Sequence, residues 1–269
     1  MSTAVATPTA TDVARPNRQH AGIPFTRLMA VELRKMFDTR SGFWLMASVV
    51  ILSVLASGAV LLFGDKGDVT YANMSSAIGI PLAILLPVIS ILSVTSEWSQ
   101  RTGLTSFTLV PHRGRVLLAK GVDTVLVGVV AMVVAMAIGA VTNLLGALAY
   151  GIDPVWETNP ADLSKIVLAN VLGMLIGFMF GLVIRNSPGA IVAYFVYWFV
   201  LSNLFFLLSS TQEWFADIER WINFQYNQTY LFDQDLVAKD WAYLAVSGVL
   251  WLVLPVAIGT WRAMRAEVK

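Results

Sequence analysis

The chain of 269 residues contains no cysteine and only two histidines, and charged residues make up just 13% of it. Disulfide bonds, thiolate metal sites and a cysteine nucleophile are therefore impossible in this chain. His20 and His112 stand far apart, in a polar N-terminal stretch and in a basic insert, so they cannot form a zinc site by themselves. These absences exclude several enzyme classes at once.

Two catalytic signatures are also missing. No G-x-x-x-x-G-K-[ST] motif occurs, so this chain does not hydrolyse ATP by that route, and no G-x-S-x-G nucleophile elbow is present. The carboxylates of Glu213, Asp217 and Glu219 are interpreted as a solvated face. We expect no catalytic residue, no metal site and no cofactor in this chain.

Long apolar segments fill most of the sequence instead. Hydrophobic residues make up 57% of the chain. A soluble domain of this length with so many apolar residues would have to expose many of them on its surface. About 20 apolar residues in a helix cross a bilayer, and lipid accepts only helices or closed barrels. Because the runs lack a period of two, they predict an all-α polytopic membrane protein. The six expected transmembrane helices cover residues of about 42–63, 73–95, 122–148, 163–184, 188–209 and 241–261.

The N-terminal region divides into a tail and an amphipathic segment. Residues 1–24, rich in Ala, Thr and Pro, predict a disordered cytoplasmic tail and not a cleaved signal peptide, and residues 25–269 predict a single transmembrane domain. Residues 25–40 carry apolar side chains at helical spacing and predict an interfacial helix. This helix is interpreted either as a membrane-surface anchor or as an elbow helix that meets a cytoplasmic partner.

Basic residues are distributed unevenly between the loops. If the tail and every second loop share one side, that side holds 14 of the 18 Lys and Arg residues, whereas the acidic residues divide 6 against 11. Cytoplasmic loops carry the basic excess. The pattern therefore predicts that both termini are cytoplasmic.

A basic insert, residues 96–120, separates the second and third expected spans. Apolar residues alternate with Thr and Ser from Leu104 to Val110, and Pro111 ends any helix because it lacks an N–H donor. Its charges, Glu97 included, are expected to perform no buried chemistry. The basic residues that follow are Arg113, Arg115 and Lys120. The simplest interpretation is that they satisfy the positive-inside preference and touch anionic lipid.

Two spans have features that indicate close packing or bending. Gly173, Gly177 and Gly181 form two overlapping G-x-x-x-G units, which allow close helix approach inside the bundle or at a dimer interface, and we favour the bundle. Pro81 and Pro87 predict a kink in the second span. The long outer loop before the last span predicts an amphipathic element at the outer membrane interface, with an apolar face formed by Trp214, Phe215, Ile218, Trp221 and Ile222.

The insert and the interfacial helix together resemble parts of the ABC type-2 permeases, the six-helix membrane subunits of ABC exporters. A carboxylate ending the second span, a basic segment with a central Pro and a Lys entering the third span are similar to that family's first cytoplasmic loop. The matching residues are Glu97, Arg101, Thr102, Gly103, Leu104, Pro111, Arg113, Arg115 and Lys120. VELRKMFDTRSGFWLM (31–46) is similar to its N-terminal interface helix, and the resemblance in helix count, orientation and loop order extends over nearly the whole chain from residue 25.

The resemblance implies that residues 96–120 form a coupling loop that docks into a separate cytoplasmic ATPase. Two ATPase copies would bind ATP and Mg, and a second permease copy or a related chain would complete the transporter; no nucleic acid is involved. The expected contact residues are Glu97, Arg101, Thr102, Arg113 and Arg115 of the loop, with Arg34 and Lys35 of the interfacial helix. The implied function is ATP-driven export of an amphipathic or hydrophobic substrate across the bacterial cytoplasmic membrane.

Within the family, spans two and five border the substrate path. Here those spans carry Asn73, Ser76, Tyr197 and Asn203, which either line the path or pair with neighbouring helices. Two other functions stay open. A carrier driven by an ion gradient would need charged relay groups at mid-membrane, whereas Asp123 lies at the cytoplasmic entrance of span three. A scaffold or immunity-type membrane protein would use the interfacial helix and the insert as partner-binding surfaces.

Overall fold

The computed structural model describes residues 23–99, 113–233 and 235–265. In this part of the chain the regular structure is helical, and the only β pairing is one isolated bridge between Thr70 and Val155. Six of the helices are long and apolar enough to cross a membrane, which confirms the predicted fold class. The elements are α1 (Phe25–Asp38), α2 (Arg40–Phe63), η1 (Lys66–Asp68), α3 (Tyr71–Ser99), α5 (Arg113–Tyr150), α6 (Pro160–Ile184), α7 (Ser187–Phe195), η2 (Val196–Leu201), α8 (Ser202–Thr211), α9 (Glu213–Ile222), α10 (Phe224–Asp233), α11 (Ala238–Gly248), η3 (Val249–Val253) and α12 (Leu254–Arg265).

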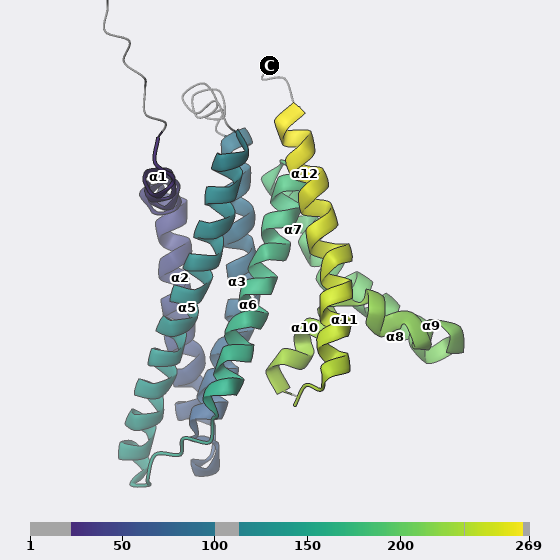
Figure 1. Ribbon diagram of the computed structural model, residues 1–269. Coiled ribbons are helices and arrows are strands. Elements are labelled where there is room, and N and C mark those ends of the chain that lie inside the picture. Colours follow the sequence, from purple (N-terminus) through teal and green to yellow (C-terminus); the bar gives the residue numbers. More distant parts are fainter. Residues whose placement is uncertain (1–22, 100–112, 234, 266–269) are drawn as a thin grey trace, which may run out of the picture.

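The helices form two groups that share α6. Figure 1 shows α2, α3, α5 and α6 side by side in one bundle, with α7 to α12 on the other side of α6. In this view α1 is seen end-on, across one end of the bundle, and the C-terminal end of α12 lies at the same end. We call this the α1 end. The fifth span continues from α7 through the π-helix η2 into α8, and the sixth runs through α11, η3 and α12.

The predicted span boundaries are close to the observed ones, with one clear exception. The first span is Gly42–Phe63, as expected, whereas the third begins at Gly114 and not near residue 122. Arg113, Arg115 and Lys120 are therefore residues of the helix α5, which begins at Arg113, and not loop residues. The extra turns form because Val116 and Ala119 bury against Leu28 of α1, so the helix has a protein partner beyond bilayer length.

The segment before the last span forms two short helices, α9 and α10, and α10 packs against α6 and α11. Of the five residues expected on one apolar face, only Phe215 is buried, while Trp214, Ile218 and Trp221 are exposed. The amphipathic element expected over these residues is thus present as the helix α9, which packs against α8 and α11.

The glycines of α6 bring its backbone against α3. A Cβ atom at Gly177 would lie 2.4 Å from the carbonyl oxygen of Pro87, and one at Gly181 would lie 3.1 Å from that of Ile91. At Gly173 the nearest atoms belong to Gln228 and Pro87. The G-x-x-x-G units are thus used for packing within the chain, as favoured from the sequence, since small residues let two helices approach closely.

This contact predicts a specific sensitivity at Gly177. We expect Gly177→Ala to lower the free energy of unfolding by about 1–3 kcal/mol, because the new methyl group meets the backbone of α3 and not a flexible side chain. Gly79→Ala on α3 is the matched control, since nothing lies within 4 Å of its added Cβ. The measurement is reversible unfolding of the purified protein in detergent. Equal effects of the two substitutions would contradict this packing.

Candidate functional site

The amphipathic pattern of α1 directs one carboxylate into the bundle. Leu28 packs against α5, and Leu33 and Met36 pack against the core formed by α2, α3 and α5. Glu32 lies one turn from Leu28 and one turn from Met36, so it shares their face of the helix. Its side chain is only 2% exposed. The apolar face of α1 therefore carries a buried acid to the ends of α3 and α5 that lie at the α1 end.

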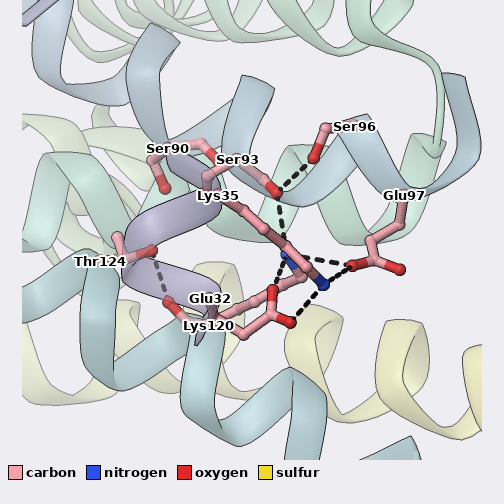
Figure 2. Close-up of polar contacts among 8 residues, drawn as sticks. All are labelled: Glu32, Lys35, Ser90, Ser93, Ser96, Glu97, Lys120 and Thr124. Carbon is pink, nitrogen blue, oxygen red and sulfur yellow. Dashed lines mark hydrogen bonds and ion pairs between the residues drawn. The ribbon is translucent and has the colours of Figure 1, made fainter. Parts of the chain in front are cut away.

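Four charged side chains meet there, and we call them the α1-end charge cluster: Glu32 and Lys35 of α1, Glu97 of α3, and Lys120 of α5 (Figure 2). Lys120 Nζ lies 2.5 Å from Glu32 Oε2 and 3.3 Å from Glu97 Oε1. Lys35 Nζ lies 2.6 Å from Glu32 Oε1 and 3.5 Å from Glu97 Oε1. Each lysine contacts both acids, so the cluster ties together three helices.

The cluster is electrically balanced and shielded from solvent on the α3 and α5 sides. Glu97 is 3% and Lys120 4% exposed, whereas Lys35 lies at the rim with 41% of its side chain accessible. Lys120 Nζ also donates to the backbone carbonyl of Ser93. Buried charges are tolerated only when they are paired and hydrogen-bonded. Both acids are paired with both lysines, while Glu32 Oε2 and Glu97 Oε2 have no hydrogen bond among the described residues.

The ion pairs shift the titration of the two α1 residues. Burial raises the pKa of Glu32, but the neighbouring Lys120 and Lys35 ammonium groups outweigh burial, and its pKa lies below the ordinary value of 4.5. Burial lowers the pKa of Lys35, but hydrogen bonding and attraction to Glu32 and Glu97 raise it above the ordinary value of 10.5. Both groups are therefore held in their charged forms at neutral pH.

A cavity borders the cluster between α1, α2 and α3. Its volume is about 400 Å³, and all four cluster residues line it together with apolar residues such as Leu45 of α2 and Ile89 of α3. Close packing therefore does not surround α1 completely. The ion pairs, with the contacts of Leu28, hold α1 against α3 and α5. The geometry of the cluster is suited to mechanical connection.

The end of α3 is also tied to the turn between α6 and α7. The hydroxyl groups of Thr95 and Ser187 share a hydrogen bond of 2.7 Å. The guanidinium of Arg185 lies over the Trp98 ring, 5.5 Å from its centroid. Burial and the nearby Arg262 both lower the pKa of Arg185. The last two turns of α3 thus contact α1, α5 and the α6–α7 turn.

The structure corrects the expectation for Glu97. It was expected at an exposed polar interface with no buried chemistry, but its carboxylate is buried because Lys35 and Lys120 from two other helices converge on it. Lys35 belongs to the same cluster. Arg34 is exposed and pairs with Asp38 of its own helix at 3.0 Å. The remaining loop residues Arg101, Thr102, Gly103, Leu104 and Pro111 lie outside the described part of the chain, as does the side chain of Arg113.

Arg115 has a local role in this structure. Its guanidinium donates to the backbone carbonyl of Ile23 at 2.9 Å, so it holds the chain that leads into α1. Two cluster members were not recognised as site residues from the sequence, Glu32 and Lys120. The usable signal for Glu32 was a carboxylate on the apolar face of an amphipathic helix. Asp123, one turn from Lys120, is likewise buried, and its carboxylate oxygens have no hydrogen-bond partner among the described residues.

The four expected path residues are not gathered at one site. Asn73 is exposed near the start of α3 and donates to the carbonyl of Asp68 at 3.2 Å, and Ser76 is exposed on the next turn. Asn203 is exposed on α8 and bonds to Phe199 of its own span. Tyr197 alone is buried, on η2. Asn73 and Asn203 thus make local bonds, whereas Tyr197 is buried between helices.

Comparison with models of known protein families and with curated proteins finds no match to this chain.

The cluster predicts that Lys120 is worth far more to stability than an exposed basic residue of α1. We expect Lys120→Met to lower the free energy of unfolding by about 3–5 kcal/mol, because it leaves Glu32 and Glu97 buried beside one rim lysine. Arg34→Met, which breaks an exposed pair, is the control and should cost less than about 1 kcal/mol. Denaturant unfolding in detergent measures both. Similar losses would rule out a stabilising role for the buried cluster.

Acid should weaken the cluster through Glu32. Because the folded-state pKa of Glu32 lies below 4.5, its contribution is complete above that value and is lost as the pH falls through the folded value. The unfolding temperature of the wild-type protein, measured from about pH 7 down to about pH 3, should fall at the acid end. The unfolding temperature of Glu32→Gln should be lower than that of the wild-type protein at about pH 7 and should fall less steeply towards acid pH. Parallel curves for the two proteins would show that Glu32 does not titrate as part of the cluster.

Proposed function

We propose that this chain is the membrane-spanning permease subunit of an ATP-driven exporter of the ABC type-2 kind. It works with a separate cytoplasmic ATPase, two copies of which bind ATP and Mg, and with a second permease copy or a related chain. The setting is the bacterial cytoplasmic membrane with both termini in the cytoplasm, and the substrate is amphipathic or hydrophobic. Six apolar helices, the basic excess on one side and the lack of a phosphate-binding motif support this assignment.

The observation that carries the proposal is the α1-end charge cluster. It joins the interfacial helix to the two spans that flank residues 100–112, and both lysines contact both acids. A force applied to α1 therefore reaches both spans directly through these ion pairs. A permease needs such a connection, because ATP binding takes place in another subunit and must move the membrane helices.

Within this mechanism, α3 has the central position. Its C-terminal end carries Thr95, Glu97 and Trp98. Pro87 lies about two turns before them, where the backbone of α3 meets Gly177 of α6. Proline removes one backbone hydrogen bond and allows a helix to bend. Movement at the α1 end would bend α3 at Pro87, while the glycine contact keeps this part of the helix against α6. The path would then open between two such chains.

Purification of the tagged chain from its own cells in mild detergent tests the proposal. We expect an ATPase subunit to co-purify and to hydrolyse ATP in the complex. Arg101→Ala combined with Thr102→Ala should reduce recovery of the ATPase by about tenfold, because polar interface residues at the centre of a contact each carry on the order of 1 kcal/mol. Lys66→Ala, on exposed η1 before α3, is the matched control and should leave recovery unchanged.

A second variant separates docking from coupling. Glu97→Gln keeps the size of the side chain but removes the charge that Lys35 and Lys120 share. We expect it to retain the ATPase while reducing export relative to ATP hydrolysis. Failure to recover any ATPase with a folded, monodisperse chain would overturn the proposal, and a membrane scaffold or a carrier driven by an ion gradient would replace it.

A further inference from the structure

A second cavity lies away from the charge cluster, between α3, α6, α10 and the α7–η2 segment. Its volume is about 140 Å³. Its walls include Pro87, Tyr194, Tyr197, Trp198 and Phe232, and none of its lining residues is charged. A cavity of about 150 Å³ is enough to bind benzene. This cavity therefore has room for one six-membered ring.

The π-helix η2 places Tyr197 in this wall. The Tyr197 ring packs against Phe180, with centroids 5.7 Å apart, and against Trp251 of the second π-helix, η3, at 5.1 Å. These contacts hold the ring between two spans. Short π-helical segments inside α-helices are frequent at functional sites. The wider turn here positions an aromatic side chain from the fifth span against the cavity.

Several polar groups of the cavity wall already have partners within the protein. Pro87 has no N–H group, so the carbonyl of Ala83 lacks its helical donor, and the Tyr194 hydroxyl donates to it at 3.2 Å. Gln228 of α10 donates to the carbonyl of Ala169 at 2.7 Å. The Ser202 hydroxyl donates to Gln225. These bonds fix the walls of the cavity and use the hydroxyl hydrogens of Tyr194 and Ser202 and one N–H of Gln228.

Two other polar groups of the cavity wall lack a hydrogen-bond partner in this part of the structure. The hydroxyl of Tyr197 and the side-chain oxygen of Asn170 are buried without a hydrogen-bond partner among the described residues. The two residues are only 6% and 3% exposed, and both line the cavity. The amide nitrogen of Asn170 is used, since it donates to the carbonyl of Ile166 at 3.0 Å. A buried polar group without a partner is costly, so two in one cavity point to a bound molecule.

We propose that this cavity binds a small neutral ligand, or the end group of a larger one, that carries an N–H donor beside a carbonyl acceptor. The donor pairs with the side-chain oxygen of Asn170, which can only accept, and the carbonyl accepts from the Tyr197 hydroxyl. The ligand is neutral because no charged side chain lines the cavity to compensate an ion at membrane depth. The aromatic walls favour a planar ring. This proposal does not rest on the proposed transport function.

The probe that fits this description is 2-pyridone, a six-membered cyclic amide. Saturation-transfer NMR on the full chain in lipid nanodiscs, with empty nanodiscs as the blank, measures its binding. We expect saturable binding that weakens about tenfold in Tyr197→Phe and in Asn170→Leu, since each loses one hydrogen bond. Tyr150→Phe is the control, because its hydroxyl bonds to the carbonyl of Leu61, outside the cavity. N-methyl-2-pyridone, which lacks the N–H, should bind as weakly as the Asn170→Leu variant binds 2-pyridone.

Thermal unfolding gives a second, independent readout. Tyr197→Phe removes a hydroxyl that has no hydrogen-bond partner in the described part of the chain, so it should not lower the unfolding temperature, whereas Tyr194→Phe breaks the bond to Ala83 and should lower it. The proposal is overturned if 2-pyridone shows no saturable binding, if benzene binds as well as 2-pyridone, or if Tyr197→Phe and the wild-type protein bind it equally. It also fails if Tyr197→Phe destabilises the chain as much as Tyr194→Phe.

Discussion

The close contact between α3 and α6 is the interaction on which the rest of this structure depends. Lipid gives apolar helices no hydrophobic reason to associate with one another, so backbone approach and van der Waals packing must hold them together. Gly177 and Gly181 permit that approach, and α3 meets them with the backbone of Pro87 and Ile91. With α3 held against α6, the C-terminal end of α3 is where α1, α5 and the α6–α7 turn make their contacts.

The positions of the buried ion pairs follow from this contact between α3 and α6. The chain carries little charge, and among the described residues the buried ion pairs gather at the α1 end, where α3 ends. Pairing is what makes the burial acceptable, since an isolated charge in such surroundings would be strongly destabilising. The cluster is a strong link for a specific reason: each lysine bridges two acids from different helices. Removing one member leaves a buried charge of the cluster without one of its partners of opposite sign.

Proline has two effects in the same helix. At Pro87 the missing N–H loosens α3, and the carbonyl that it leaves without a donor is taken by Tyr194 from the fifth span. The proline therefore also creates a connection between α3 and α7. In the proposed transporter, Pro87 forms part of the wall of the uncharged cavity, so bending of α3 at Pro87 would change that wall.

The sequence by itself determined the six membrane helices, most of their ends and the amphipathic helix before them, because apolar length and periodicity are local properties. It also indicated that the α6 glycines pack closely. Only the tertiary structure decided what they pack against, that Glu97 is buried, and that Tyr197 and Asn170 face one cavity. Periodicity marks which face of a helix is buried but does not identify the helix that covers it. Residues 32, 97 and 120 become partners only when α1, α3 and α5 meet.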